Sequence, residues 1–522
     1  MLSKIFKPSG TGGAAFILML ASVLSYAAGM LRDRTLSHIF GATRLTDAYN
    51  AAFLIPDFLF NLFIAGALYT AFLPIYTSYL KEDTKEAEKI ANTVLTLGTL
   101  FLFVLAVIFF FLTPILVPLI FSGIDSSDHK MIIEMTQILL ISPVVFCLSN
   151  AIGTMLMTHK HFIAYAFSGF LYNIGIILGI LFLHQYFGIY SAAIGSVLGV
   201  MLHLGIRLLN LLILPHKLKL DFSFFHPGIK KIIFLMIPKT VNLMTTQASL
   251  WAYTIVGYSL MEGSIAAFNY ARNLQSFPVS LFGIALATAA FPFLSDHAHA
   301  KDTKKFSNDF QSSLEKILFF TIPASVGMML LKTEIVEIIL KGGEFNELAV
   351  ILTSSCLFFF IISIPFESAV HLFARGFYAY KNTLTPMIIA IISTAINITF
   401  CVLSANILGI KSISAAFLIG AAVQLILLAI FIRKKIQEFN IKSFVIKFLK
   451  ISASAVIMGL AVYLIPTVMP EINFLTTQLI RVIVGTLIFF ALAYLLRCRE
   501  MSFITTLFNK FKKRESGNSS PS

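Results

Sequence analysis

The stretch from residue 90 to residue 118 reads IANTVLTLGTLFLFVLAVIFFFLTPILVP and contains no charged side chain. A helix needs about 20 mostly apolar residues to cross about 30 Å of hydrocarbon at about 1.5 Å per residue. The run is continuous and does not alternate between polar and apolar residues, so it favours a spanning helix over a strand of a closed barrel. Similar runs recur along the chain, which predicts an all-α polytopic membrane protein.

The composition supports this fold class. Of 522 residues, 58% are hydrophobic and only 12% are charged, against about 25% charged in soluble domains. The net charge is +14, and Phe occurs 52 times against one Trp. The cations stand between long apolar runs, so the composition excludes a soluble enzyme or a soluble nucleic-acid binder.

The apolar runs predict fourteen spanning helices. We expect no cleavable signal peptide, because the first run has no A-x-A-like exit and continues into Arg32, Asp33 and Arg34. The predicted spans are 13–32, 47–80, 90–118, 132–157, 162–184, 189–211, 231–260, 264–295, 314–331, 348–375, 383–407, 413–432, 451–469 and 474–496.

The loop cations predict the orientation. With the N-terminus inside, the inside segments hold 29 of the 39 Lys and Arg residues, as the positive-inside rule requires. Both termini are then cytoplasmic, and the basic tail around Lys510, Lys512 and Lys513 lies at the anionic inner leaflet. The inside segments are 1–12, 81–89, 158–161, 207–231, 296–316, 375–382, 433–450 and 497–522.

The sequence carries no motif for catalysis or for a cofactor. There is no Walker loop, no HExxH motif and no spaced His/Cys cluster, so we expect neither an enzyme nor a bound cofactor or metal. The four cysteines have no pairing spacing and suit small packing residues. Energy for transport must then come from an ion gradient, the membrane potential or downstream consumption of the substrate.

A weak internal repeat indicates two halves. Residues 70–74 (TAFLP) resemble residues 288–292 (TAAFP) at an offset of 218, and both stretches close the second helix of a six-helix set. Two six-helix lobes with the same orientation are a transporter design. We therefore predict an N-lobe at 1–228, a C-lobe at 229–440, two further helices at 441–500, and a basic tail at 501–522.

Polar residues inside the first two spans are candidates for a binding site, because an ionisable residue there costs at least about 2.5–3.5 kcal/mol. Ser25 and Arg32 lie on one small, polar stripe; Asp33 is adjacent to Arg32 but points about 100° away, so the two need not pair. The alternative is that Arg32 and its neighbours form the outer interfacial end of the helix. Asp47 lies on a polar face of the second run, whose length and prolines predict a bend, with freed backbone groups facing a cavity.

The second half has its own candidates. Lys239 and Arg272 lie on polar faces of the seventh and eighth predicted spans; Lys239 has the alternative of snorkelling to the surface. Arg375 closes the tenth span and is either an interfacial anchor or a gate. Guanidinium groups suit bidentate phosphate recognition, so a cavity with apolar walls and cations at Arg32 and Arg272 suits an amphiphile with an anionic head.

At this point the chain resembles the MurJ (MviN) lipid II flippase family, of which it looks like a divergent member. The matching motifs keep the same order across nearly the whole chain and agree with fourteen helices. They are residues 29–33 (GMLRD), 40–42 (FGA), 46–49 (TDAY), 55–56 (IP), 65–67 (AGA), 71–74 (AFLP), 270–272 (YAR), 277–278 (FP), 281–286 (LFGIAL), 342–345 (GGEF), 376–379 (GFYA) and 383–386 (TLTP).

The resemblance implies a fold, a substrate and a location. The fold is that of the multidrug/oligosaccharidyl-lipid/polysaccharide exporters, with a groove for a polyprenyl tail formed by the two last helices at 441–500. The substrate is undecaprenyl-pyrophosphoryl disaccharide-peptide, moved from the inner to the outer leaflet of a bacterial cell membrane by rocking of the lobes, and we expect a monomer. The family-important positions that match are Ser25, Arg32, Asp33, Asp47 and Arg272.

Three positions depart from the family pattern. Tyr26 and Phe60 stand where the family usually has arginines, and Gln275 stands where an acidic residue often follows the eighth-span Arg. Part of the cationic cluster is therefore absent, and we hypothesise that Lys239 compensates.

Other functions stay open on the sequence. A flippase of another polyprenyl-linked glycan, such as an O-antigen or capsule unit, would share the same logic. A drug or metabolite antiporter of this fold predicts twelve helices and acidic coupling residues. A polyprenyl-handling enzyme predicts clustered Asp or His at one membrane face, and a purely stabilising role for Arg32 and Arg272 is the remaining alternative.

Overall fold

The computed structural model describes most of the chain. It covers residues 11–61, 69–214, 218–433, 435–436, 438–468, 473–498 and 500–501. For residues 11–16, 69–70, 237–239, 241–242 and 468 it describes the backbone alone.

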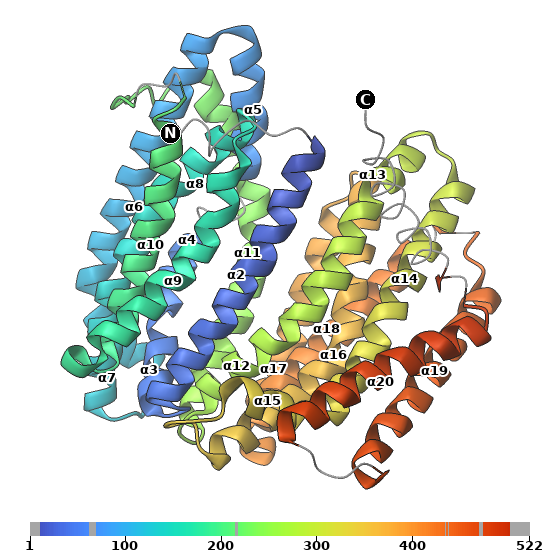
Figure 1. Cartoon of the computed structure of the whole chain (residues 1–522). Helices are drawn as coiled ribbons and strands as arrows, with labels where there is room; N and C mark the ends of the chain where they lie inside the picture. Colours follow the sequence, from blue (N-terminus) through green and yellow to red (C-terminus); the bar gives the residue numbers. More distant parts are fainter. Residues whose placement is uncertain are drawn as a thin grey trace, which may run out of the picture. The chain divides into compact units, whose positions relative to one another are not determined.

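Helices make up nearly all of the described regular structure (Figure 1). Among the described residues, the one exception is an isolated antiparallel β-bridge between Gly342 and Phe345. The helices of the first 260 residues are α2 (Thr11–Phe40), α3 (Arg44–Ala52), α4 (Leu54–Phe60), α5 (Tyr69–Glu82), α6 (Thr84–Ile120), α7 (Ser126–Leu139), α8 (Ile141–Thr158), α9 (Phe162–Phe187), α10 (Tyr190–Leu211) and α11 (Pro227–Ser259). The remainder are α12 (Ser264–Pro278), the π-helix η2 (Val279–Ile284), α13 (Ala285–His299), α14 (Thr303–Leu330), α15 (Lys332–Leu340), α16 (Glu347–Ala379), α17 (Leu384–Leu408), α18 (Lys411–Ile432), α19 (Ile441–Val468) and α20 (Phe474–Leu495).

The described residues contain 11 helical segments long and apolar enough to cross a membrane. They confirm the all-α polytopic class and match eleven of the predicted spans. The other three predicted spans, 13–32, 47–80 and 231–260, fall on α2, on α3 to α5 and on α11. The count of fourteen therefore stays a prediction.

The chain forms two compact units. The first comprises Met1–Tyr270, Ile339–Leu352 and Cys401–Ile410, and the second comprises Ala271–Ile338, Thr353–Phe400 and Lys411–Ser522. The units divide inside α12, so α11 belongs with the N-terminal helices. The predicted boundary between lobes at residue 228 stays a prediction.

The second predicted span is broken, as its prolines led us to expect. In a continuous helix the ring of Pro56 would clash with the carbonyl of the residue four positions earlier, and Pro56 has no N–H to bond to that carbonyl. The helix α3 accordingly ends at Ala52. The freed Ala52 carbonyl accepts a hydrogen bond from Thr136 Oγ1 of α7 at 3.1 Å. The expectation that freed groups face a cavity is wrong for this carbonyl, because a neighbouring helix satisfies it.

π-Helical backbone occurs at matching places in the two halves. Asn61 is π-helical after α4, and the π-helix η2 begins at Val279, after Pro278. These positions differ by the same offset of 218 that relates the two sequence motifs. Pro74 and Pro292, also separated by that offset, both lie inside helices, α5 and α13. The predicted repeat thus has a counterpart in the backbone, where π-turns often accompany functional sites.

Four glycines set the close packing of α9 on α10. Gly175 and Gly179 face Gly199 and Gly195, and a Cβ added at either Gly175 or Gly179 would lie 2.2 Å from the Cα of its partner. Small residues four apart let helix backbones approach in a membrane, where apolar burial gives little driving force. This contact fixes α9, which in turn packs against α2 and carries the amide described next.

Candidate functional site: an arginine with an acidic partner in each unit

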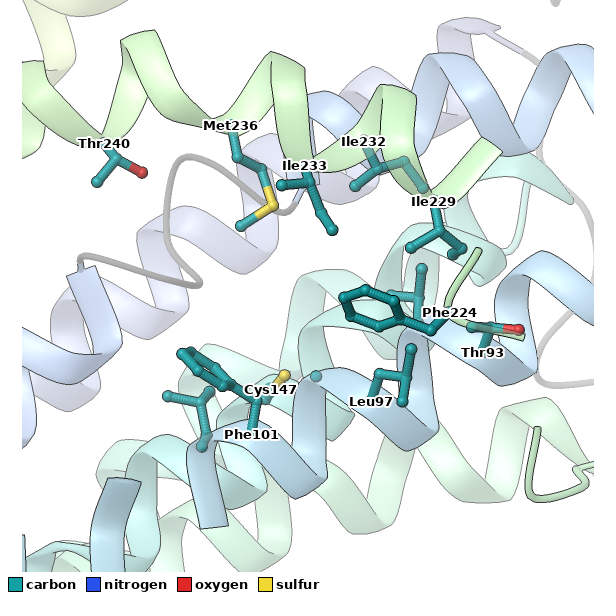
Figure 2. Close-up of a pocket in the computed structure, with 13 residues that line it drawn as sticks. Thr93, Leu97, Phe101, Cys147, Phe224, Ile229, Ile232, Ile233, Met236 and Thr240 are labelled. Carbon is teal, nitrogen blue, oxygen red and sulfur yellow. The ribbon is translucent and has the colours of Figure 1, made fainter. Parts of the chain in front are cut away.

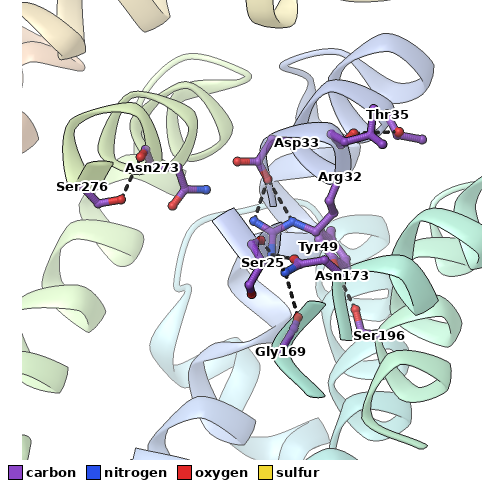
Figure 3. A network of polar contacts seen from close by, with 11 residues as sticks. Ser25, Arg32, Asp33, Thr35, Tyr49, Gly169, Asn173, Ser196, Asn273 and Ser276 are labelled. Carbon is purple, nitrogen blue, oxygen red and sulfur yellow. Dashed lines mark hydrogen bonds and ion pairs between the residues drawn. The ribbon is translucent and has the colours of Figure 1, made fainter. Parts of the chain in front are cut away.

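Arg32 lies at the centre of a polar network on α2 (Figure 3). Its Nε and Nη2 atoms donate to Asp33 Oδ1 at 3.0 and 2.7 Å, and its Nη1 atom donates to Asn173 Oδ1 at 3.1 Å. Although adjacent helical residues point apart, the long arginine side chain folds back to reach the short carboxylate. Arg32 and Asp33 therefore do pair. The Arg32 side chain keeps 25% exposure while that of Asp33 keeps 9%, so the arginine is the more exposed side chain of the two.

Asn173 of α9 orients this guanidinium. Its amide nitrogen donates to the Ser25 carbonyl at 3.3 Å and to the Gly169 carbonyl at 3.1 Å. These bonds fix which end of the amide is the donor, so its oxygen is turned to Arg32. Ser25 contributes its backbone carbonyl, and a Cβ added at Gly169 would lie 3.1 Å from Ser25 Oγ. The structure thus brings Ser25, Arg32 and Asp33 together through Asn173.

Asp47 has a different environment. It is fully buried, and its two carboxylate oxygens accept the backbone N–H groups of Gly263 at 2.7 Å and Ala266 at 2.9 Å. Gly263 immediately precedes α12, and Ala266 lies in its first turn, where a helix leaves its N–H donors without intrahelical partners. Asp47 of α3 therefore caps a helix remote in sequence. Its predicted substrate contact stays a prediction, but the structure gives the carboxylate a structural task.

Arg272 lies in the second unit on α12. The carboxylate of Glu367, from α16, interacts electrostatically with it. Glu367 Oε2 also accepts a hydrogen bond from Gln275 Nε2 at 2.6 Å, and Gln275 is buried. In the family resemblance an acidic residue often stands at this position, three residues after the arginine. In this chain the acidic group comes from another helix, and Gln275 holds it by a hydrogen bond.

Arg375 is half-buried near the end of α16. Its Nη2 donates to Thr288 Oγ1 of α13 at 2.7 Å, and its Nη1 donates to the His371 carbonyl at 3.2 Å. The arginine therefore links α16 to the repeat motif on α13. Whether it acts as an anchor or a gate stays a prediction. Lys239 belongs to α11, and its side chain lies outside the described part.

The position of one absent family arginine is filled by aromatic packing. The Phe60 ring lies 4.9 Å from that of Phe146 and packs against the buried core of the first unit. A charged group at residue 60 would lose this contact. Tyr26 is partly buried on α2.

An apolar cavity of about 490 Å³ lies within the first unit (Figure 2). Leu97 and Phe101 of α6 line one side, with Cys147 of α8 beside them, and Ile233 and Met236 of α11 line the opposite side. Its shape and lining suit a hydrocarbon segment. None of its described lining residues is a cation or belongs to the Arg32 network.

Sequence reasoning missed Asn173 and Glu367. Each is a polar residue inside a long apolar helix, and the rule that singled out Arg32 and Arg272 applies equally to Glu367. A search of the eighth and tenth spans for opposite charges would have found Arg272 and Glu367, which interact electrostatically. Asn173 carries no charge, so its importance follows from its contact with α2.

Relatives with similar sequences cover almost the whole chain. The family described as "Lipid II flippase MurJ" matches residues 36–485. A probable lipid II flippase MurJ from Bdellovibrio bacteriovorus is 25% identical over 94% of this chain and 96% of its own length. The lipid II flippase MurJ from Thermosipho africanus is 28% identical over 91% of this chain and 94% of its own length.

Solved structures agree with these relatives. A lipid II flippase MurJ in an inward closed conformation matches with a TM-score of 0.79 and 26% identity, covering 92% of this chain and 99% of that one. An inward-facing multidrug resistance MATE family transporter of the MOP superfamily matches with a TM-score of 0.65 and 14% identity, covering 81% of this chain and 98% of that one, which shows the fold. With the family match extending over most of the chain, the protein belongs to the MurJ lipid II flippase family.

Proposed function

We propose that this protein is a lipid II flippase, which moves the undecaprenyl-pyrophosphate-linked peptidoglycan precursor from the inner to the outer leaflet for cell-wall synthesis. It is a transporter that changes no covalent bond of its substrate. Family membership and the agreement with a MurJ structure over nearly the full chain support this activity. The fold shared with MATE transporters suits alternating access by two rocking lobes.

The Arg32 network is the observation that carries the proposed mechanism. Arg32 uses three of its five N–H groups on Asp33 and Asn173 within the described residues. The remaining two can reach a phosphate oxygen while Asn173 holds the guanidinium plane in place. A pyrophosphate would compete with Asp33 for the same cation, so binding exchanges one anionic partner for another and does not leave the arginine bare.

Arg272 has an equivalent arrangement in the second unit. Glu367 attracts Arg272 in the absence of substrate, and Gln275 fixes the position of that carboxylate. Each proposed cation thus has a carboxylate partner that compensates its charge in the resting protein. This arrangement limits the cost of keeping a charged group inside the membrane.

The lipid tail has a suitable groove in the second unit. A cavity of about 410 Å³ lies between α14, α16 and α19, with Val326, Ile362 and Leu460 among its lining residues. Its walls are almost entirely aliphatic, as polyprenyl chains require. We assign the tail to this groove, which α19 lines and α20 does not; the predicted groove between the two last helices stays a prediction.

The proposed location is the bacterial cell membrane. The protein is multi-pass, and the loop cations favour cytoplasmic termini. We propose that it works as a monomer driven by an ion gradient or the membrane potential, since no nucleotide-hydrolysing motif is present in the sequence. Its partners are lipid II and the bilayer.

The test is complementation of a bacterium depleted of its own lipid II flippase. Expression of this chain should restore growth and outer-leaflet lipid II. Arg32→Ala and Arg272→Ala should abolish rescue at normal membrane abundance. Glu367→Gln should lower it, because the amide cannot hold Arg272 by charge. Arg433→Ala is the control, since Arg433 is exposed and makes no hydrogen bond or ion pair with any described residue.

Absence of rescue by the wild-type chain at normal abundance would count against lipid II as the substrate. Full rescue by both arginine variants would overturn the cavity mechanism while leaving the substrate in place. Lys239→Ala should reduce rescue if Lys239 compensates for the absent arginines at positions 26 and 60. Unchanged rescue would remove that hypothesis.

A further inference from the structure

A cationic pocket lies at one end of the last two helices. It has a volume of about 340 Å³ and is formed by the first turns of α19 and the residues that follow α20. The pocket belongs entirely to the second unit, and it is separate from Arg272. Its lining residues are Asn440, Lys442, Ser443, Ile446, Lys447, Lys450, Arg497 and Cys498.

Four of these eight residues are cations, and none is a carboxylate. Lys447 is neutralised, since its Nζ lies 2.7 Å from Glu315 Oε2 and that carboxylate is buried. Lys450 Nζ donates to the Leu496 carbonyl at 2.9 Å, which holds its charge at the pocket wall without cancelling it. Lys442 and Arg497 are exposed and form no side-chain hydrogen bond or ion pair with a described residue. Three cations therefore remain uncompensated by the pocket lining.

The backbone adds to this positive field. The pocket includes the beginning of α19, where the helix dipole and free N–H groups favour an anion. Asn440 Oδ1 accepts the N–H of Ser443 at 2.9 Å, so the first turn is ordered. Arg497 has a φ of 53°, a left-handed conformation that ends α20 and places this cation after the helix.

The surroundings of the pocket are apolar. Ile441, Val445 and Leu449 are exposed on α19, and Leu495 is 72% exposed on α20. Both helices contain segments long and apolar enough to span the membrane. A cationic pocket next to exposed aliphatic side chains at the end of spanning helices matches a lipid with an anionic head group and acyl chains.

We propose that this pocket binds the phosphodiester head group of an anionic glycerophospholipid, with the acyl chains lying along α19 and α20. Lys442, Lys450 and Arg497 contact the phosphate, and Lys447 stays paired with Glu315. The site lies at the junction of the two last helices, so a bound lipid fastens their ends to each other. The proposal is independent of the flippase activity.

The test uses the full-length protein in a non-ionic detergent without added substrate. Binding of phosphatidylglycerol with a fluorescent acyl chain is measured by polarisation, and phosphatidylcholine with the same label serves as the neutral comparison. Each surface cation near a membrane anion is worth about a fivefold change in affinity. The triple variant Lys442→Gln, Lys450→Gln, Arg497→Gln should therefore weaken phosphatidylglycerol binding by roughly 100-fold.

The matched control removes three exposed cations from other helix ends. Lys301→Gln, Lys304→Gln and Lys381→Gln lower the net charge equally, and Lys301 and Lys381 share the left-handed backbone of Arg497. This variant should bind phosphatidylglycerol as the wild type does. A second variant, Lys442→Glu, places an acid in the first turn of α19, where it favours the helix, so it should fold normally and still lose binding.

Unchanged binding in the triple variant and in Lys442→Glu would overturn the proposal. Equal loss in the control triple variant would also overturn it, because the effect would then reflect total charge. Inorganic phosphate distinguishes a lipid site from a simple anion site. Displacement of the lipid by low millimolar phosphate would refute the assignment to a lipid, whereas retention in excess phosphate supports it.

Discussion

The buried cap at Asp47 gives a sharp test of how α3 holds α12. Asp47→Ala removes both acceptors and leaves the N–H groups of Gly263 and Ala266 unpaired. Asp47 is fully buried and its bonds measure 2.7 and 2.9 Å. An unsatisfied buried donor costs about 1–3 kcal/mol. Two such donors predict a loss of roughly 2–6 kcal/mol in the free energy of unfolding.

Asp47→Asn should lie between the wild type and the alanine variant. The amide oxygen still accepts one N–H, but the amide nitrogen is a donor that faces the second N–H. One donor then stays unpaired, which predicts a loss of about 1–3 kcal/mol. The order of stability is therefore wild type, asparagine, alanine.

The assay is chemical unfolding of the purified protein in detergent, followed by fluorescence of the single tryptophan, Trp251, which lies in the same unit. Asp125→Ala is the matched control. Asp125 is the N-cap residue of α7, but its side chain makes no capping hydrogen bond and is exposed. If Asp47→Ala unfolds at the same denaturant concentration as Asp125→Ala, the capping argument is wrong. If Asp47→Asn keeps full stability yet fails to complement, the predicted substrate role of Asp47 gains support.

Three further predictions concern other parts of the structure. Arg481→Leu should destabilise the second unit by about 3 kcal/mol, because the carboxylate of Glu334, which lies 2.9 Å from the guanidinium, loses its partner. Chemical unfolding measures this loss. A loss of unfolding free energy smaller than that caused by Lys411→Leu, which removes an exposed cation, would contradict the prediction. Gly179→Val should push α9 away from α10, because an added Cβ lies 2.2 Å from Gly195 Cα, and should lower the free energy of unfolding by about 1–3 kcal/mol or more. Gly205→Val on α10 is the control and should be tolerated, because a Cβ there meets nothing within 4 Å. Cross-linking between the two helices is the readout. Asp302 lies between two spans, and the backbone N–H and the side chain of Lys305 hold the pKa of its carboxyl below the ordinary range. The resulting stabilisation is present above a pH of about 4 and is lost as the pH falls through the lowered pKa. In thermal unfolding, the stability advantage of the wild type over Asp302→Ala should therefore shrink in acid, and a difference that stays constant with pH would refute the prediction.

The fold class followed from the sequence because the bilayer imposes a rule that can be read locally. Long runs without charge, such as residues 90–118, must become helices in hydrocarbon, whatever their neighbours. The break in the second span was also local, since Pro56 acts on the carbonyl four residues earlier. Arg32 and Arg272 were found by the same local rule, because a charge inside an apolar run stands out.

The contacts of these residues required the tertiary structure. Whether Arg32 pairs with Asp33 depends on Asn173, which lies 141 positions away and is turned by two carbonyls. The capping by Asp47 depends on a helix that begins more than 200 residues later. The carboxylate that interacts with Arg272 comes from α16, about 95 residues further along the chain. A sequence records which side chains are present, but the partner of a buried polar group is set by which helices pack together, and only the folded chain decides that.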